Sequence, residues 1–264
     1  MQLYAHSLNL ITVVAGLVIG IHCGAVGAEV LLLGKLVQHF IQYELATFPR
    51  FGLSHFANRF PKETQQIQLK IAGDIDEPTT VTEELRALPR VEQTSDFHCV
   101  TTWTTRSLRW GGFLFSDFFN RIVVPQARPQ RDALFVILRC QDGYAVSLPL
   151  ADLMADTVLL ADRLNGDHLA VEHGAPIRLV APAHYGYKSA KHLRAVEFWR
   201  DDRRYRSPGF RFMDHPRARV ALEERGRSVP GWLLRYLYRP LVGPTIRRFK
   251  SALDRRLKSN DDAA

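Results

Sequence analysis

Short runs of β-favouring residues separated by turns place the tightest limit on how this chain can fold. Residues 66–71 alternate between polar and apolar side chains, which is typical of a half-buried strand. Residues 134–138 and 144–148 flank Asp142-Gly143, a dipeptide that favours the turn of a β-hairpin. The pattern therefore predicts strands joined by tight turns in the middle of the chain.

Further strand and helix signals are interleaved with these runs. They are strands at 177–180 and 195–199, a short helix after the capping pattern Thr80–Glu83 that ends near Pro89, a helix after Ser116-Asp117, and a helical turn at 150–154. Strands and helices do not alternate regularly, so we expect a mixed α+β domain and not a βαβ repeat. We place this main domain at residues 49–210.

The first 48 residues form a separate, apolar N-terminal segment that contains a continuous apolar run, Leu10–Leu33. The run is long enough to span a membrane, but Glu29 and several glycines within it also suit a docked apolar helix or a misplaced start site. No paired arginines or basic leader precede the run, and Lys35 and Arg50 follow it. The positive-inside rule then predicts a cytoplasmic protein that is possibly membrane-associated.

The basic charge of the chain is concentrated at its C-terminal end. Residues 200–264 contain 17 Lys and Arg against 8 Asp and Glu, whereas residues 1–199 contain 18 against 19. Within the extension 211–264, a predicted helix carries Ile246, Phe249, Leu253 and Leu257 on one face, with basic residues around the remainder. Such a helix suits docking on its own domain, an anionic membrane surface or a protein partner. We expect no nucleic-acid partner because the extension has no recognition motif.

Several common sites are absent from the sequence. It has no dinucleotide-binding glycine motif, no Walker loop, no HExxH and no GxSxG. The three cysteines form neither a disulfide framework nor a CxxC pair. Cys99 lies between His98 and a Thr-Thr-Trp segment, where it suits either core packing or a thiolate that holds a soft metal. Cys140 follows a strand and is interpreted as packing.

A second segment combines basic residues with glycine-containing turns. It runs from His173 through Arg178 to Lys191 and includes Gly186, Lys188 and Ser189. Arginine and lysine side chains together with turn amides suit an anion site, although a solvated basic loop has the same composition. On residues alone, both interpretations remain open.

Together these segments resemble the oxidoreductase molybdopterin-binding domain family, which includes sulfite oxidases and bacterial methionine sulfoxide reductases. The resemblance covers about residues 51–205. It rests on the order Gly73-Asp74-Ile75, Leu88-Pro89, Cys99–Trp103, Trp110-Gly111-Gly112, 173–180, 185–191 and Glu197-Phe198. It implies a mixed α+β domain around a molybdenum–molybdopterin cofactor, with the Cys99 thiolate as the metal ligand.

The resemblance also implies roles for other residues. His173 and Arg178 match positions near the pterin and its phosphate, and His55 lies in the segment that corresponds to the family's entry segment. The loop that closes on the anionic end of the cofactor corresponds to Gly186, Lys188, Ser189 and Lys191. Tyr205 resembles the active-site tyrosine of sulfite oxidases. Ser54 stands where sulfite oxidases carry an arginine, so the resemblance does not single out sulfite.

The leading hypothesis is therefore a molybdenum-dependent oxidoreductase that transfers an oxygen atom to or from a small anionic or S-oxide substrate. No haem-binding segment is recognisable, so we expect a separate electron donor or acceptor protein. The alternative is a degenerate, non-catalytic family member that acts as a membrane-associated binding protein.

Overall fold

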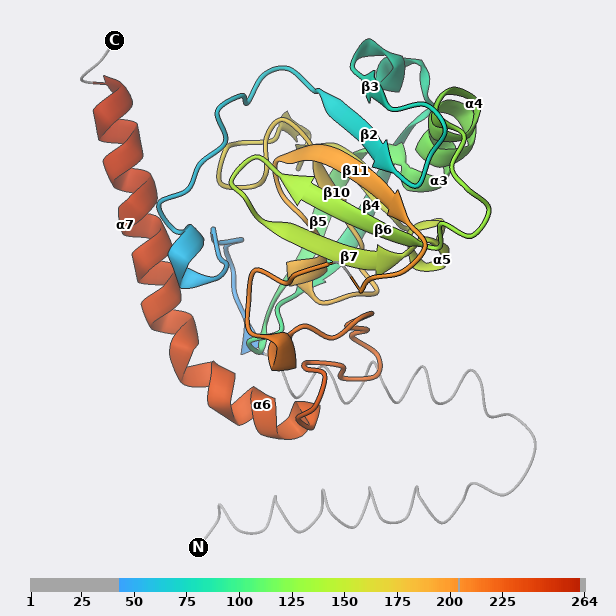
Figure 1. Cartoon of the computed structure of the whole chain (residues 1–264). Helices are drawn as coiled ribbons and strands as arrows, with labels where there is room; N and C mark the ends of the chain where they lie inside the picture. Colours follow the sequence, from blue (N-terminus) through green and yellow to red (C-terminus); the bar gives the residue numbers. More distant parts are fainter. Residues whose placement is uncertain (1–42, 204, 262–264) are drawn as a thin grey trace, which may run out of the picture. The chain divides into compact units, whose positions relative to one another are not determined.

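The computed structural model describes residues 43–203 and 205–261, and its strands form two β-sheets (Figure 1). The first sheet has the order β1-β5-β8-β10, with β4 paired to β5 and β9 paired to β8. Its strands are β1 (Tyr43–Glu44), β4 (Arg90–His98), β5 (Trp103–Leu114), β8 (Leu159–Leu164), β9 (Asp167–His168) and β10 (Arg178–Val180). The apolar run Leu10–Leu33 lies outside the described residues.

The second sheet has the order β3-β2-β11-β6-β7. Its strands are β2 (Leu69–Gly73), β3 (Thr79–Val81), β6 (Phe135–Cys140), β7 (Ala145–Pro149) and β11 (Leu193–Trp199). β6 and β7 form the antiparallel hairpin expected from Asp142-Gly143, in which Gly143 has a φ of +88°. β2 and β11, far apart in sequence, pair in parallel. The expected mixed α+β class is confirmed.

Short helices connect the strands. They are α3 (Phe115–Phe118), a π-helical turn (Phe119–Val123), α4 (Val124–Ala127), α5 (Leu150–Leu153), and 3₁₀ turns at Ser54–Phe56, Glu83–Ala87, Gly186–Lys188, Arg211–Met213 and Arg239–Leu241. The predicted capping pattern at Thr80–Glu83 is wrong. Thr80 lies inside β3 and pairs with Lys70, and the Glu84 carboxylate accepts the amide of Thr82. The chain here forms a strand and a 3₁₀ turn because tertiary pairing outweighs the local helix signal.

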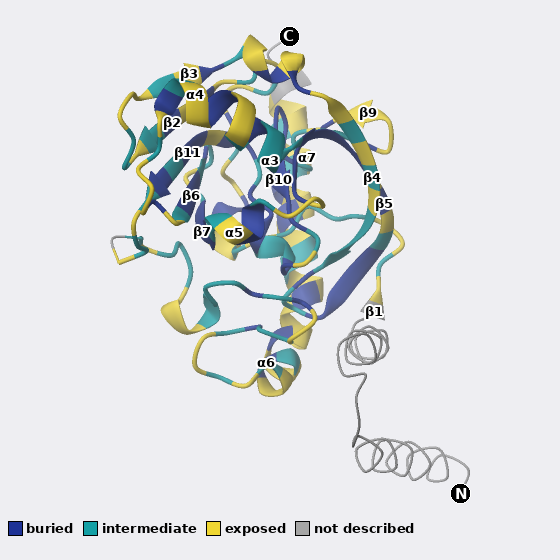
Figure 2. Cartoon of the chain, turned by 90° about the vertical axis from the view of Figure 1, so that its right-hand side faces the viewer, coloured by how far each residue is buried: buried dark blue, intermediate teal, exposed yellow. Residues whose placement is uncertain are grey.

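The main core is formed by the apolar faces of the sheets and the short helices, as the buried colouring in Figure 2 shows. Leu69, Ile71, Val136, Leu138 and Val196 are all completely buried there. Cys140 is 1% exposed in the same cluster, which confirms its interpretation as a packing residue.

Two helices follow at the C-terminal end, α6 (Gly231–Tyr238) and α7 (Val242–Asp261). The apolar face of α7 is docked on the chain's own domain: Phe249 and Ala252 are each 3% exposed and pack against Phe56 and Ala57. Leu257, which we expected on the same apolar face as Phe249, remains 49% exposed. The docked alternative is therefore the correct one for the buried part of this helix. None of the helices in residues 43–203 and 205–261 is both long and apolar enough to cross a membrane.

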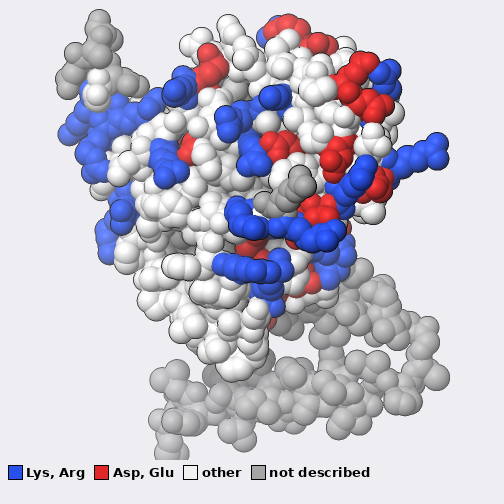
Figure 3. Space-filling view, in the orientation of Figure 1, with Lys and Arg blue, Asp and Glu red and all other residues white. Residues whose placement is uncertain are grey.

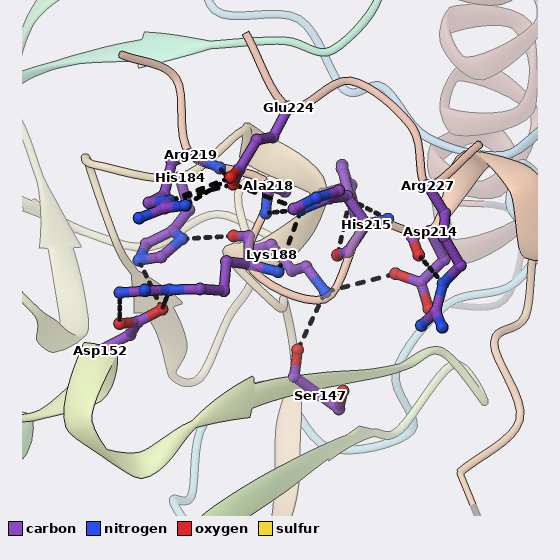
Figure 4. Close-up of polar contacts among 12 residues, drawn as sticks. Ser147, Asp152, His184, Lys188, Asp214, His215, Ala218, Arg219, Glu224 and Arg227 are labelled. Carbon is purple, nitrogen blue, oxygen red and sulfur yellow. Dashed lines mark hydrogen bonds and ion pairs between the residues drawn. The ribbon is translucent and has the colours of Figure 1, made fainter. Parts of the chain in front are cut away.

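Contacts also cross the boundary that we placed at residue 210. The segment after it forms partly buried hydrogen bonds with the body of the domain. They include Asp214 with Lys188 (Figure 4), Arg217 with Asp152, and Arg225 with the carbonyl of Val100. The boundaries 1–48, 49–210 and 211–264 stay predictions. The contacts show that residues 214–225 pack on the domain.

Candidate functional site

Cys99 lies in the tight turn between β4 and β5. Its amide donates to the carbonyl of Trp103 at 2.8 Å, and Thr102 adopts the left-handed conformation with a φ of +79°. This turn points the thiol inward, where Cys99 is 6% exposed and packs against Trp103 and against Val242 of α7. Burial raises the pKa of the Cys99 thiol, although the Thr101 hydroxyl, 3.1 Å from the sulfur, opposes that shift.

A cavity opens next to this thiol, and four separate parts of the chain line it. They are the segment 48–56, the β4–β5 turn, the β6–β7 turn with Asp142 and Tyr144, and the loop 186–192. Met213, and Phe249 from α7, complete the lining of the cavity. The apolar part of the lining comes mainly from aromatic side chains, which are Phe48, Phe51, Phe56, Phe97, Trp103 and Phe249. The site therefore combines one thiol with a largely apolar wall and a few charged groups.

Gly186 is required in this wall by close packing. A Cβ atom at Gly186 would lie 2.0 Å from Cζ of Phe97, closer than any real contact. The loop 186–192 can therefore approach the β4–β5 hairpin only with glycine at this position. Gly174 is required for a related reason, since it has a φ of +116° and packs against Arg178 and Lys191.

Arg178 is completely buried, and the acceptors that its guanidinium has among the described residues are all neutral. It donates to the main-chain carbonyls of His173 at 2.8 Å, Ser189 at 3.1 Å and Leu179 at 3.3 Å. Its guanidinium carbon also lies 4.9 Å from the centre of the Trp110 ring. Burial lowers the pKa of Arg178 to about 9. A buried cation without a carboxylate partner is costly unless an anion compensates it.

Lys191 lines the cavity and has a similar environment. Its ammonium group donates to the carbonyl of Glu172 at 2.9 Å, and no carboxylate of the described residues forms an ion pair with it. Burial of the ammonium group, reinforced by nearby Arg178, lowers the pKa of Lys191 to about 7. Arg178 and Lys191 thus place two charges beside the cavity that neighbouring acids do not neutralise.

Two histidines adjoin these cations, and both are neutral at physiological pH. His173 stacks on Phe48 with ring centres 5.1 Å apart, and its buried Nδ1 has no hydrogen-bond partner among the described residues. Burial lowers the pKa of His173 to about 4. His192 lines the cavity, its Nδ1 lies 2.7 Å from the carbonyl of Ala175, and burial lowers its pKa to about 3.

The structure brings some of the expected site residues together and separates others from them. Cys99, Gly186, Ser189 and Lys191 line the cavity, with His173 and Arg178 directly behind the loop. His55, Lys188 and Tyr205 are not part of the lining.

The three remaining residues have other partners. Lys188 is completely buried and donates to the Ser147 carbonyl at 3.0 Å and to Asp214 at 3.3 Å (Figure 4). The Tyr205 hydroxyl donates to the carbonyl of Ala145 at 3.0 Å. His55 is exposed beside the ring of Phe56. Roles for these three at the cofactor or in the chemistry stay predictions, and this geometry does not favour them.

Most of the lining residues were not among the expected site residues, and they include Arg50, Asp142, Tyr144, His192 and Phe249. Arg50 donates to the carbonyls of Ala57 and Arg59, at 2.7 and 2.8 Å. Arg50 lines the cavity, whereas Ser54, which the resemblance placed at the family's arginine position, does not. The hairpin signal did predict the turn that carries Asp142, but nothing local indicated that this turn faces Cys99.

No group of three or more His, Cys, Asp and Glu side chains within the described ranges is arranged to hold a metal ion.

Comparison with known proteins yields several relatives. An uncharacterized oxidoreductase of Bacillus subtilis, YuiH, is 38% identical over 143 residues, 54% of this chain and 68% of that protein. The catalytic subunit of the protein-methionine-sulfoxide reductase MsrP of Campylobacter jejuni is 30% identical over 63% of this chain and 60% of that protein. A putative subunit of such a reductase in Azospira oryzae, YedZ1, is 27% identical over 51% of this chain and 49% of that protein.

Among solved structures, the sulfane dehydrogenase SoxCD of Paracoccus pantotrophus matches with a TM-score of 0.47 and 23% identity, over 58% of this chain and 43% of that one. The chain thus spans between about half and two thirds of the length of the sequence relatives. The profile of the family described as oxidoreductase molybdopterin binding domain matches residues 57–206, more than half of the chain. The chain therefore belongs to the family of molybdopterin-binding oxidoreductase domains.

Proposed function

We propose that this molybdopterin-dependent oxidoreductase transfers an oxygen atom to or from the sulfur of a small anionic or S-oxide substrate, with the Cys99 thiolate as the ligand that the protein gives to molybdenum. The observation that carries the proposal is the position of the Cys99 thiol at a cavity with two cations beside it, completely buried Arg178 and half-buried Lys191.

The residues at the cavity fit a molybdenum–pterin cofactor. A thiolate is a soft ligand that suits molybdenum, and metal binding would remove the proton that burial otherwise holds on Cys99. Among the described residues no carboxylate forms an ion pair with Arg178 or Lys191, so a phosphate could compensate both charges. The unpartnered Nδ1 of His173 is a further polar atom for the anionic end of the group. When bound, the cofactor would supply the two-electron oxidation and reduction.

The protein's own contribution is to enclose the site and to orient the substrate in it. Phe48, Phe97 and Trp103 form an aromatic wall that excludes water from the neighbourhood of the thiol. Arg50, which also lines the cavity, creates a positive potential that favours an anionic substrate or the oxygen of an S-oxide. Arg50 would act here in place of the arginine that Ser54 replaces. The methionine sulfoxide reductase among the relatives supports an S-oxide as the substrate.

We also propose that a separate protein donates or accepts the electrons. The relatives named as subunits of a reductase support this arrangement. A cytoplasmic location is likewise a proposal, based on Lys35, Arg50 and Arg59 after the apolar run.

The direct test is cofactor analysis of the purified chain, followed by dye-linked assays with sulfite and with methyl sulfoxides. We expect equimolar molybdenum and pterin, and turnover that is faster with one substrate class than with the other. Protein that retains molybdenum but turns over neither class would support the alternative of a non-catalytic family member. Protein without molybdenum or pterin, even when produced in a host that makes the cofactor, would contradict the proposal.

A further inference from the structure

α6 and the 3₁₀ turn Arg239–Leu241 that follows it expose several large apolar side chains to solvent. Trp232, Tyr236, Leu237 and Leu241 are 56%, 62%, 58% and 53% exposed, and Leu233 is 38% exposed. We call these five residues the α6 face. Large apolar side chains that gather on one side of an exposed helix commonly mark an interaction site.

The α6 face is not needed to hold the helix on the domain. Leu234 and Tyr238, on the opposite side of α6, are 1% and 5% exposed and provide the packing. Arg235 lies 3.7 Å from Glu223 and adds a polar contact on the domain side. Substitutions on the α6 face should therefore leave the fold intact.

Within the sequence segment that contains α6, all the charged side chains are basic. Residues 225–253 contain seven Lys and Arg and no Asp or Glu. Arg239, Arg247 and Arg248 are exposed at the end of α6 and in the first turns of α7. Figure 3 shows a largely uncharged surface at the α6 end of the molecule, with basic side chains along the neighbouring α7 side. Tryptophan, tyrosine and leucine flanked by arginines suit the interface of an anionic bilayer.

We propose that the α6 face inserts into the headgroup region of an anionic membrane, with Arg239, Arg247 and Arg248 near lipid phosphates. This assigns membrane contact to α6 and not to the apolar face of α7, which is buried against Phe56 and Ala57. The proposal is independent of the redox function, because it rests on residues outside the cavity.

Trp232 provides a direct probe in the full-length protein. Two of the other three tryptophans, Trp103 and Trp110, are almost completely buried, and the third, Trp199, is partly buried. With vesicles of phosphatidylcholine and phosphatidylglycerol, we expect a blue shift of the emission and quenching by lipids brominated on their acyl chains. Trp232→Phe should abolish most of this signal and keep binding, because phenylalanine retains the apolar area.

Co-sedimentation with the same vesicles separates α6 from the N-terminal run. The double variant Trp232→Ser/Leu237→Ser should weaken binding about tenfold or more, since two large apolar side chains no longer insert. Leu134→Ser, at a 57% exposed leucine elsewhere, is the matched control and should bind normally. Pure phosphatidylcholine or high salt should also weaken binding, because the arginines lose their counter-charges or are screened.

Two results would overturn the proposal. The first is vesicle binding that is unchanged in the double variant while Trp232 is not quenched, which would assign binding to another segment. The second is no vesicle binding together with a double variant that loses self-association or a protein partner, which would make the α6 face a protein interface.

Discussion

At the scale of single residues, the most informative groups are the two cations behind the loop 186–192. Arg178 donates to three main-chain carbonyls and Lys191 to one, and neither forms an ion pair with a carboxylate of the described residues. Such charges are stable inside a protein when a bound anion compensates them. We therefore assign them to cofactor retention and not to structural ion pairing.

Arg178→Met and Lys191→Met should lower the molybdenum and pterin content of purified protein much more than they change turnover per bound cofactor. Loss of one partner of a buried charge pair costs about 2–5 kcal/mol of binding. The matched control is Arg194→Met, at an exposed position on β11 close to Lys191 in sequence. Full cofactor occupancy in both site variants would remove the two residues from the anion site.

The pKa of Lys191 predicts a pH dependence for the cofactor-free protein. Burial lowers this pKa from 10.5 to about 7, so between these values the unfolded chain binds more protons than the folded chain. The Lys191 contribution to stability should therefore rise with pH across that range. A bound dianion favours charged Lys191, so sulfate should raise the melting temperature more at pH 6 than at pH 9.

Lys191→Met is the control for this measurement, and it should lose the pH-dependent part of the sulfate effect. Chloride at equal ionic strength should stabilise both proteins less than sulfate does. An equal response of wild type and Lys191→Met to sulfate at both pH values would mean that no anion binds at Lys191.

At the scale of elements, α7 completes a site whose other parts belong to the matched domain. Phe249 lines the cavity and packs closely on Gly52. A Cβ atom added to Gly52 would lie 3.3 Å from Cζ of Phe249. Val242 contacts the cluster of Cys99 and Trp103. The helix lies outside residues 57–206, the part of the chain that the family profile matches, yet it covers the cavity.

Phe249→Ala should lower the free energy of unfolding by about 3–5 kcal/mol, because it removes a buried ring and leaves a cavity. Leu257→Ala, on the same helix but 49% exposed, should change it by no more than about 0.5 kcal/mol. Urea unfolding of the two variants checks both values. Equal, small losses would show that α7 is not docked in solution.

Element prediction from sequence succeeded where the signal was local. The hairpin of β6 and β7 follows from Asp142-Gly143 and its flanking runs, which carry strand and turn preferences in adjacent residues. β4 and β5 were missed as strands because the sequence from 103 to 114 is interrupted by Ser107, with a φ of +54°, and by two glycines. Gly112 is explained only by pairing with β8, since a Cβ there would lie 2.2 Å from the Leu160 carbonyl oxygen.

At the scale of the whole molecule, buried polar contacts join the segment after residue 210 to the domain. Asp152 accepts from Arg217 and lies near His184, and the side chain of Asp214 is 12% exposed beside completely buried Lys188 (Figure 4). Burial lowers the pKa of Lys188, while Asp214 opposes that shift. These contacts make the segment a structural part of the fold.

Asp214→Asn should cost about 3–5 kcal/mol of stability, because the buried ammonium of Lys188 loses its carboxylate. The loss should become smaller as pH rises, since Lys188 can then lose its proton. Asp156→Asn, at an exposed position, is the control and should have little effect. Equal unfolding free energies for wild type and Asp214→Asn would indicate that this ion pair contributes nothing.

The site was only partly predictable from sequence because its residues converge from distant parts of the chain. Cys99, Ser189 and Lys191 were expected from an ordered set of motifs, and they do meet at one cavity. Arg50 and Phe249 could not be assigned to it, because their approach depends on how the segment 48–56 and α7 pack against each other. Lys188 lies within the loop 186–192, but its side chain points to Asp214 and not into the cavity.

The most direct test of the central claim is X-ray absorption at the molybdenum edge of the purified holoenzyme and of Cys99→Ser. If the Cys99 thiolate binds the metal, the wild type should contain one more sulfur ligand than the variant, while Cys140→Ala should match the wild type. The variant should also lose most of its turnover and keep its fold, because a hydroxyl is a poorer ligand than a thiolate. An unchanged sulfur count in Cys99→Ser, with molybdenum still bound, would contradict the assignment of Cys99 as the metal ligand.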